Sequence, residues 1–389
     1  MNKSKEFEMI FESTFKGITN EVSVWPDFSY RKENRIKGSL HRKKKVAVLF
    51  GGCSTEYEIS LQSAHAIITH MDKNLYDPVL IGITKNGEWY LYKGKVDNIP
   101  NDTWFSVETC IPAVFSPSKH LHGIVTFGKE EVNIIQLDAA FPVLHGKNGE
   151  DGTVQGILQL ASIPIVGCDS LCSALCMDKD MAHRVVHAAG IKTPRSYVLQ
   201  NKMDIGIALA EAEDLGYPLF VKPVKAGSSF GITKVSSKNT LPQAIKIAFE
   251  YDNRVIIEES INGFEVGCAV LGTDELIIGN VDEIELSQGF FDYTEKYTMK
   301  TSHIHVPARI SYEKAEEIKK TATAIYKVLG CSGFARVDMF LTLDGDIVFN
   351  EVNTIPGFTS HSRYPNMLKS IGFSFEEIIR KLIELAVRK

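Results

Sequence analysis

The chain has 389 residues, a length that predicts two or three domains. Hydrophobic residues make up 44% and charged residues 23%, which excludes a largely disordered chain. No stretch approaches the roughly 18 apolar residues of a membrane helix, and the charged N-terminus lacks the apolar region of a secretory signal. We therefore expect a cytoplasmic protein without a membrane partner.

The formal net charge of −5 is unevenly distributed. Residues 1–45 hold 11 Lys and Arg against 6 Asp and Glu, whereas the remainder holds 32 against 42. The basic run 42–45 could contact nucleic acid, but the acidic body would repel phosphate backbones, so we expect no nucleic-acid partner. Residues 1–43 show no sustained periodicity, and we interpret them as a flexible N-terminal extension.

Seven cysteines, an odd number in a chain without a secretory signal, indicate a reducing compartment. Cys168, Cys172 and Cys176 recur at i, i+4 and i+8 and could share a helix face. A metal site would need a further ligand, and no His or acid completes the set at that spacing. Because small buried thiols are common in protein cores, we predict that these three cysteines are packing residues.

The first predicted domain is an α/β unit over residues 44–168. An apolar strand at 46–50 runs into Gly51-Gly52 and then into a helical pattern from about residue 58. A dinucleotide fingerprint is absent, because the sequence there is not GxGxxG. Further strands are predicted at 78–84, 139–143 and 163–166.

Two further units are predicted after this domain. The central unit, 169–262, combines helices and strands in the order 178–189, 194–199, 203–215, 219–222, 232–235, 241–251 and 255–259. The C-terminal unit, 263–389, has a strand, a long polar and aromatic segment, a helix, a hairpin and a last helix, at 265–271, 282–307, 312–329, 335–353 and 375–387.

The hairpin at 335–353 places four polar groups together. If Asp344-Gly345 forms a two-residue type I′ turn, Asp338 pairs with Glu351 and Arg336 with Asn353, all on one face of the sheet. Directly opposed acids repel unless a cation neutralises them, and two carboxylates with an amide oxygen suit Mg²⁺. The guanidinium beside them suits a phosphoryl group or an oxyanion, so we predict a Mg-nucleotide site. The opposite face would pack on a helix through Val337, Met339, Leu341, Leu343, Val348 and Val352.

The loop at 227–231 reads Gly-Ser-Ser-Phe-Gly and follows a predicted strand that ends in Lys222. GxSxG matches the nucleophile elbow of serine hydrolases, but a strand-like run follows where that motif needs a helix. A P-loop is excluded because GxxxxGK[ST] is absent. We interpret the segment as a small-residue lid over phosphates that Lys222 would reach, with a plain hairpin turn as the alternative.

Two more polar segments are candidates for a site. The loop 145–152 has three glycines and follows a predicted strand, at the end where α/β proteins bind ligands; an ordinary surface turn is the alternative. The segment 290–297 is polar and aromatic, and it could form a lid that excludes water.

Eight motifs in order resemble the D-alanine–D-alanine ligase family of ATP-grasp enzymes, over about residues 44–388. They lie at 51–60, 145–152, 177–179, 222–231, 258–265, 293–297, 336–338 and 350–362. The resemblance implies an ATP-grasp fold of α/β class. An N-terminal parallel-sheet domain would bind the first substrate, and α+β central and C-terminal lobes would bind ATP.

The activity that the resemblance implies is ATP-dependent, ADP-forming ligation of two D-amino acids for peptidoglycan synthesis. The carboxylate of D-alanine would be phosphorylated, and the amino group of the second substrate would attack the acyl phosphate. The cofactors would be ATP and two Mg²⁺ ions, with Mn²⁺ as a substitute, and the enzyme would be a homodimer.

The resemblance also implies roles for individual residues. ATP would be held by Lys179, Lys222, Glu258, Glu259 and Glu265, and the two Mg²⁺ ions by Asp338, Glu351 and Asn353. Catalysis would depend on Glu56, Ser228, Tyr297, Arg336 and the Gly357 N–H. The second substrate would lie near His145, oriented by Glu150, with Lys296 and Ser362 on its carboxylate.

One departure from the family pattern concerns the second substrate. Members that take D-alanine there carry an apolar residue after the final His-Ser, whereas Arg363 follows here. The core is most similar to the VanG type of D-alanine–D-serine ligase from vancomycin resistance, and retention of Tyr297 argues against D-lactate ligases. We predict D-serine as the second substrate, with Asp282, Phe291 and Arg363 shaping a hydroxyl pocket.

Three alternatives remain. The first is that Arg363 merely pairs with a surface acid and shapes no substrate pocket. The second is that the protein is a housekeeping D-alanine–D-alanine ligase with an unusual pocket. The third is a nucleotide-binding sensor without turnover, against which the intact acid pair and Arg336 argue.

Overall fold

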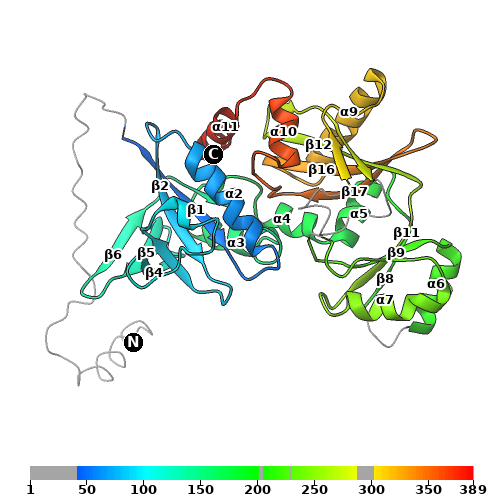
Figure 1. The fold of residues 1–389 in the computed structure, drawn as a ribbon, viewed down its shortest axis with the longest axis horizontal. Helices are drawn as coiled ribbons and strands as arrows, with labels where there is room; N and C mark the ends of the chain where they lie inside the picture. Colours follow the sequence, from blue (N-terminus) through cyan, green and yellow to red (C-terminus); the bar gives the residue numbers. More distant parts are fainter. Residues whose placement is uncertain (1–41, 201–204, 228, 287–301, 389) are drawn as a thin grey trace, which may run out of the picture. The chain divides into compact units, whose positions relative to one another are not determined.

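The computed structural model describes residues 42–200, 205–227, 229–286 and 302–388. Residues 43–389 form one compact unit that contains three β-sheets (Figure 1). Apolar side chains recur with the periods of strands and helices. They form four buried hydrophobic clusters around these sheets.

The first sheet has seven strands in the order β6-β5-β4-β3-β2-β1-β7. In chain order the strands are β1 (Lys44–Gly51), β2 (Tyr76–Ile83), β3 (Trp89–Tyr92), β4 (Cys110–Phe115), β5 (Gly123–Phe127), β6 (Val132–Gln136) and β7 (Ala139–Pro142). Strand β1, the last but one in this order, is parallel to both neighbours, and its apolar run is buried, as a strand covered on both faces requires. The helices of this part are α2 (Tyr57–His70), the 3-10 turn η1 (Val96–Asn98) and α3 (Thr153–Leu160).

The second sheet is antiparallel, with strands in the order β10-β9-β11-β8. Two helices, α4 (Ser170–Met177) and α5 (Lys179–Ala188), lead into it. Its elements are β8 (Ser196–Leu199), α6 (Ile205–Leu215), β9 (Leu219–Pro223), β10 (Thr233–Val235), η2 (Lys238–Thr240), α7 (Leu241–Ala248) and β11 (Val255–Glu259). Apolar residues of α6 and α7 bury a small core against these strands.

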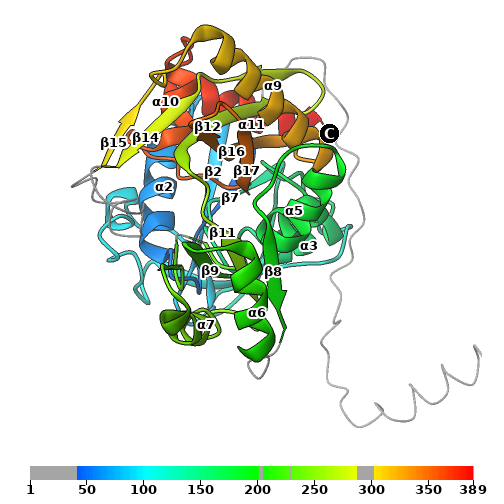
Figure 2. The same ribbon diagram turned by 90° about the vertical axis from the view of Figure 1, so that its right-hand side faces the viewer.

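The third sheet follows the order β15-β14-β12-β16-β17, with β13 paired to β12. Its strands are β12 (Gly263–Gly272), β13 (Leu276–Ile278), β14 (Asp282–Leu286), β15 (Ser302–His305), β16 (Gly333–Thr342) and β17 (Ile347–Asn353). The helices are α9 (Tyr312–Val328), α10 (Arg363–Lys369) and α11 (Phe375–Arg388). Helix α9 contacts β12, β16 and β17, and helix α11 contacts α2 and β7 of the first sheet domain as well as β16 (Figure 2).

Most predicted helices and strands are present within one to three residues of their expected ends, but the prediction of one strand was wrong. Residues 163–166 form only an isolated parallel bridge, between Ala140 and Ile165. The antiparallel strands β3 to β6 were not predicted, because their short mixed runs lack a strong period. The lobe boundaries given above stay predictions.

The hairpin of β16 and β17 has a different turn from the predicted one, but the pairing at its open end, around Asp338 and Glu351, is as predicted. Thr342 N donates to Asp346 O, so the loop is longer than the expected Asp344-Gly345 turn. A register shift between Asp338 and Met339 compensates, since Met339 pairs with Phe349 while Asp338 pairs with Glu351.

Because of the extra residue in this bulge, the side chains of β17 that face α9 differ from the predicted ones. Ile347 and Phe349 join Val337 in the cluster under α9, whereas Val348 pairs with Phe340 and lies outside that cluster. Leu343, predicted to pack there too, is exposed in the loop.

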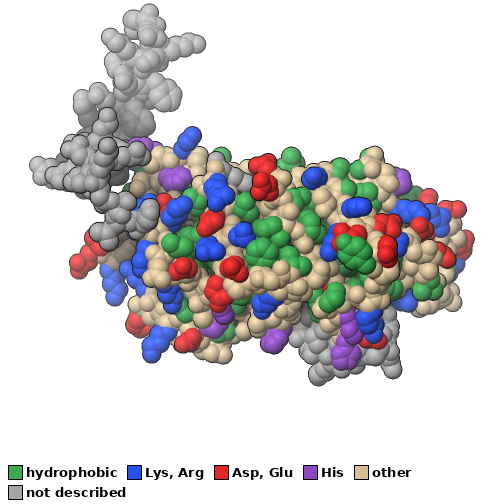
Figure 3. Space-filling view, turned by 90° about the horizontal axis from the view of Figure 1, so that it is seen from above, with side chains coloured by type: hydrophobic (Ala, Val, Ile, Leu, Met, Phe, Trp, Pro, Cys, Tyr) green, Lys and Arg blue, Asp and Glu red, His purple; other side chains and the backbone are tan. Residues whose placement is uncertain are grey.

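The surface of the body carries both signs of charge. Lysine, arginine and acidic side chains are interspersed over the face seen in Figure 3. Among the described residues, no helix has the length and apolar character to cross a bilayer.

Candidate active site

The site is built around Asp338, a carboxylate on β16 that is 1% exposed. Arg336 Nε donates to its Oδ1 at 2.8 Å and Nη2 to its Oδ2 at 2.6 Å, and Asn353 Nδ2 donates to Oδ2 at 2.9 Å. The predicted pairs Arg336 with Asn353 and Asp338 with Glu351 are confirmed. Burial alone would lower the pKa of Arg336, but the charge of Asp338 raises it, so the guanidinium stays charged.

Two cavities of similar size flank this hairpin. A cavity of about 660 Å³ is lined, among others, by Glu56, His145, Glu150, Gly227, Arg336, Asn353, Gly357, Ser362 and Arg363. A second, of about 690 Å³, is lined by Lys179, Lys222, Glu258, Glu259, Glu265 and Glu351 with several apolar side chains. The residues predicted for the amino-acid substrates therefore gather in one cavity, and those predicted for ATP gather in the other.

In the second cavity, Lys222 and Glu258 form a buried ion pair. Lys222 Nζ donates to Glu258 Oε2 at 2.5 Å, and the His183 ring lies 3.7 Å from Glu258 Oε1. Burial raises the pKa of Glu258, but the positive charge of Lys222 outweighs it and lowers the pKa. Glu258 Oε1 has no hydrogen-bond partner among the described residues, which leaves an acceptor in the wall of the cavity.

Lys179, Glu259 and Glu265, also predicted for ATP, line the same cavity with different partners, and Glu265 Oε1 accepts from Arg363 Nη1 at 2.8 Å. Lys179 Nζ donates to Ala226 O at 2.9 Å and lies 3.6 Å from Glu351 Oε2. Glu259 accepts from the backbone N–H of Arg195 at 2.8 Å and from its Nε at 3.1 Å.

In the first cavity, the Glu56 carboxylate lies at the start of α2, against two loops. The backbones of Gly146 and Gly227 approach it so closely that a Cβ at Gly146 would lie 2.5 Å from Glu56 Oε2, and a Cβ at Gly227 would overlap the same atom. Both positions therefore need glycine if this 6%-exposed carboxylate is to keep its place. Gly146 belongs to the predicted 145–152 loop after β7, and Gly227 opens the predicted lid loop after β9.

His145 is a neutral, fixed ring in the same cavity. Its Nδ1 lies 2.8 Å from Ile355 O and its Nε2 3.1 Å from Ser63 Oγ, which accepts from Phe358 N at 3.2 Å. This network is satisfied when Nδ1 donates to the carbonyl and Nε2 accepts from the hydroxyl. Burial lowers the pKa of His145 to about 4, so the ring is uncharged at neutral pH.

The predicted orientation of His145 by Glu150 is corrected by the structure. Glu150 Oε2 accepts from Gly146 N at 2.8 Å and Oε1 accepts from Ile355 N at 3.1 Å, so Glu150 and His145 contact the N–H and the carbonyl of the same residue, Ile355, and not each other. Burial, aided by the negative charge of Glu56, raises the pKa of Glu150 to about 8. A protonated Glu150 is therefore well populated near neutral pH.

Arg363 is the first residue of α10, and three acidic side chains surround it. Its Nε and Nη2 donate to the two oxygens of Asp282 at 2.7 and 2.8 Å, and Nη1 donates to Glu265 Oε1 at 2.8 Å. Nη2 also lies 3.4 Å from Asp338 Oδ1. Arg363 and Asp282 are 7% and 0% exposed, so the alternative of a surface ion pair is wrong.

The remaining predicted site residues divide into described and undescribed ones. Gly357 and Ser362 line the first cavity, and Ser362 Oγ accepts from Thr359 N at 2.9 Å. Four lie outside the described residues: Ser228, Phe291, Lys296 and Tyr297.

Sequence reasoning missed Ser63, His183 and the Ile355 carbonyl as parts of the site. Ser63 had a detectable signal, because Ser60 and Ser63 follow Glu56 by four and seven residues on the apolar face of a helix. The Ile355 carbonyl is a backbone group, and His183 contacts Glu258 across 75 residues, so neither leaves a local pattern.

Comparison with known proteins places the chain in a family. Two family profiles match: "D-ala D-ala ligase N-terminus" over residues 45–168 and "D-ala D-ala ligase C-terminus" over residues 185–384. The chain belongs to the D-alanine–D-alanine ligase family. Its members are ATP-dependent ligases of the ATP-grasp type, so the family, fold and enzyme class predicted from sequence are confirmed.

Individual relatives differ in their second substrate. The crystal structure of the VanG D-Ala:D-Ser ligase from Enterococcus faecalis is 59% identical, with a TM-score of 0.83, covering 89% of this chain and all of that chain. The vancomycin B-type resistance protein VanB of Enterococcus faecalis is 47% identical, over 89% of this chain and 99% of its own. A D-alanine–D-alanine ligase of Caldicellulosiruptor bescii is 46% identical, over 89% of this chain and 96% of its own. The chain is therefore a ligase that joins D-alanine to a second D-configured residue.

Proposed function

We propose that this ligase joins D-alanine to D-serine, through a D-alanyl phosphate, and supplies peptidoglycan precursors of the kind that confer vancomycin resistance. The observation that supports D-serine is Arg363, a buried guanidinium in the wall of the amino-acid cavity. Asp282 and Glu265 fix its orientation. A fixed polar group offers hydrogen-bonding capacity to a hydroxyl and is poorly matched to the methyl group of D-alanine.

The nucleotide and the metal would occupy the second cavity and the acid pair. Lys179 and Lys222 would neutralise the phosphates of ATP, and the free acceptor Glu258 Oε1 would take a donor from its base or ribose. Glu259 and Glu265 line the same wall.

The metal would be held by the hairpin. Asp338, Glu351 and Asn353 give an all-oxygen donor set, which fits Mg²⁺, and the family resemblance implies two such ions. Bound there, Mg²⁺ would neutralise the phosphate charge and make phosphoryl transfer to the carboxylate easier.

The amino-acid cavity would position both substrates. Glu56 would hold the ammonium group of the first D-alanine, with Ser228 and Tyr297 beside it. Arg336 and the Gly357 N–H would stabilise the oxyanion that develops when the second amino group attacks. Neutral His145 and Ser362 would line the second position, with Lys296 on the carboxylate of that substrate, and Phe291 would complete the hydroxyl pocket.

The identity to the D-Ala:D-Ser ligase VanG also supports this proposal. The second candidate, D-alanine–D-alanine ligation, is favoured by the 46% identity to the Caldicellulosiruptor bescii enzyme. A homodimer remains our prediction for the assembly.

The test is acceptor selectivity in the presence of ATP, Mg²⁺ and D-alanine. We expect a higher kcat/KM for D-serine than for D-alanine as second substrate, with the mixed dipeptide as the main product. Arg363→Met removes the polar partner and should shift the ratio toward D-alanine by roughly 5- to 150-fold, the range of one buried hydrogen bond.

The controls separate selectivity from damage. Arg380→Met, an exposed site on α11, should leave the ratio unchanged. Because Arg363→Met leaves the buried Asp282 without its ion-pair partner, the double variant Arg363→Met with Asp282→Asn keeps the net charge of the pocket unchanged and should show the same shift. A wild-type enzyme that prefers D-alanine near neutral pH would overturn the proposal.

A further inference from the structure

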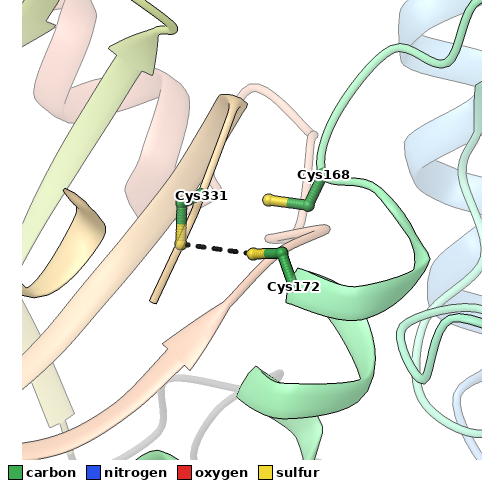
Figure 4. Close-up of side chains that lie close together, drawn as sticks. All are labelled: Cys168, Cys172 and Cys331. Atoms are coloured by element: carbon green, nitrogen blue, oxygen red, sulfur yellow. Dashed lines mark hydrogen bonds between the residues drawn. The ribbon is translucent and has the colours of Figure 1, made fainter. Parts of the chain in front are cut away.

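A cluster of four buried thiols lies outside the catalytic cavities. Cys172 and Cys176 are on α4, as the sequence spacing predicts, whereas Cys168 precedes that helix. The fourth thiol, Cys331, comes from the turn between α9 and β16, more than 150 residues away. All four are at most 7% exposed. Figure 4 shows Cys168, Cys172 and Cys331 pointing toward one another.

The distances among three of these four sulfurs are those of a tetrahedral metal site. Sγ of Cys172 lies 3.6 Å from Sγ of Cys331 and 3.8 Å from Sγ of Cys176, and the third edge, Cys176 to Cys331, is 4.0 Å. Sγ of Cys168 lies within 4.8 Å of those of Cys172 and Cys331. Four sulfurs at a Zn–S distance of about 2.3 Å have edges of about 3.8 Å, so the three edges among Cys172, Cys176 and Cys331 already match, and a rotation of the Cys168 side chain toward Cys176 would complete the geometry.

We propose that Cys168, Cys172, Cys176 and Cys331 form a structural Zn²⁺ site. The sequence-based prediction of packing residues lacked a fourth ligand, and Cys331 supplies it from a distant part of the chain. On binding, Zn²⁺ displaces one proton to solvent from each thiol that coordinates it. A site with four protein ligands leaves no open position, so its role is structural.

The surroundings of the thiol cluster are apolar, since all four cysteines belong to one buried hydrophobic cluster. Such surroundings keep water away from a bound ion, as a closed structural site requires.

The proposed zinc site would connect three parts of the structure. Cys168 ends the segment that matches the N-terminal family profile, and Cys331 precedes β16, which carries Arg336 and Asp338. Cys168 Sγ also contacts Ser332 O at 3.5 Å. One ion would therefore join the first sheet domain, α4 and the catalytic hairpin.

Elemental analysis tests the proposal on the full-length chain. Protein purified under reducing conditions, without chelator, from zinc-replete culture should contain about one zinc per chain. Cys172→Ala with Cys331→Ala removes the shortest edge and should lose the zinc. Cys268→Ala is the matched control, because Cys268 is buried in the same hydrophobic cluster but outside the thiol cluster, and it should keep the zinc.

A second measurement needs no variant. Co²⁺ added to chelator-treated, reduced wild-type protein should give the thiolate charge-transfer absorption of a tetrahedral site, at one equivalent, and Mg-ATP should not displace it. The zinc-loaded protein should also melt at a higher temperature than the chelated protein. The absence of both zinc and the cobalt–thiolate spectrum from the wild type would overturn the proposal, as would zinc that survives in the double variant.

Discussion

Gly227→Ala tests whether the position of the Glu56 carboxylate sets the affinity for the first substrate. The added Cβ would overlap Glu56 Oε2 and lie 3.3 Å from its Cδ. The atom that must move is the end of a flexible side chain, so the fold should survive. The backbone of Gly146 also lies close to this oxygen, which limits the room for its movement.

The size of the effect follows from this geometry. An ordinary carbon–oxygen contact is longer than the overlap by about 1 Å, so the carboxylate must withdraw by about that distance. A displacement of about 1 Å at a substrate-positioning group can cost on the order of 10²-fold in rate. We expect kcat/KM for D-alanine in the first site to fall by about 10- to 100-fold, mainly through KM.

Phosphate release measures the effect when D-alanine is varied at saturating ATP and D-serine. Gly156→Ala is the matched control, because a Cβ there has nothing within 4 Å, and it should leave both KM and the melting temperature close to wild type. A normal KM for D-alanine in a folded Gly227→Ala enzyme would show that Glu56 does not position this substrate.

Two further predictions concern charge at the site. Glu351→Gln should lower Mg²⁺-dependent turnover by about 10²-fold while circular dichroism shows an intact fold, since its side chain is 24% exposed; near-normal turnover would contradict the metal assignment. Glu150 has a folded pKa of about 8 against its ordinary 4.5, so its contribution to stability is present below about pH 4.5 and lost as the pH rises through 8. The melting temperature of the wild type should therefore fall relative to Glu150→Gln between these pH values, and a constant difference would refute the raised pKa.

The hairpin shows how far sequence reasoning reached at the site. The pairs Asp338–Glu351 and Arg336–Asn353 were predicted from a tight turn that the structure does not have. The longer loop shifts the register by one residue, and the bulge before Glu351 shifts it back. Bulges depend on tertiary packing, so local sequence does not reveal them.

Long-range contacts explain the other differences. The family resemblance placed Asp282 with Arg363 in one pocket, but the ion pairs of Arg363 with Asp282 and Glu265 were not predicted, because these acids lie on β14 and β12, 81 and 98 residues away. Cys331 was invisible to a spacing argument for the same reason. Predictions were strongest where one element carried the whole pattern, as in the buried strand β1 and the amphipathic helix α11.

The contact of Arg363 with Asp338 would couple the proposed choice of acceptor to the proposed metal site. An enzyme that exchanges this arginine for an apolar residue leaves Asp282 without its charge partner and removes a positive charge 3.4 Å from Asp338. Mutants that acquire a new acceptor preference through position 363 alone should therefore be less stable or bind metal differently. Substitutions at positions 363 and 282 are therefore expected to occur together in related enzymes, because either one alone leaves a buried charge without its partner.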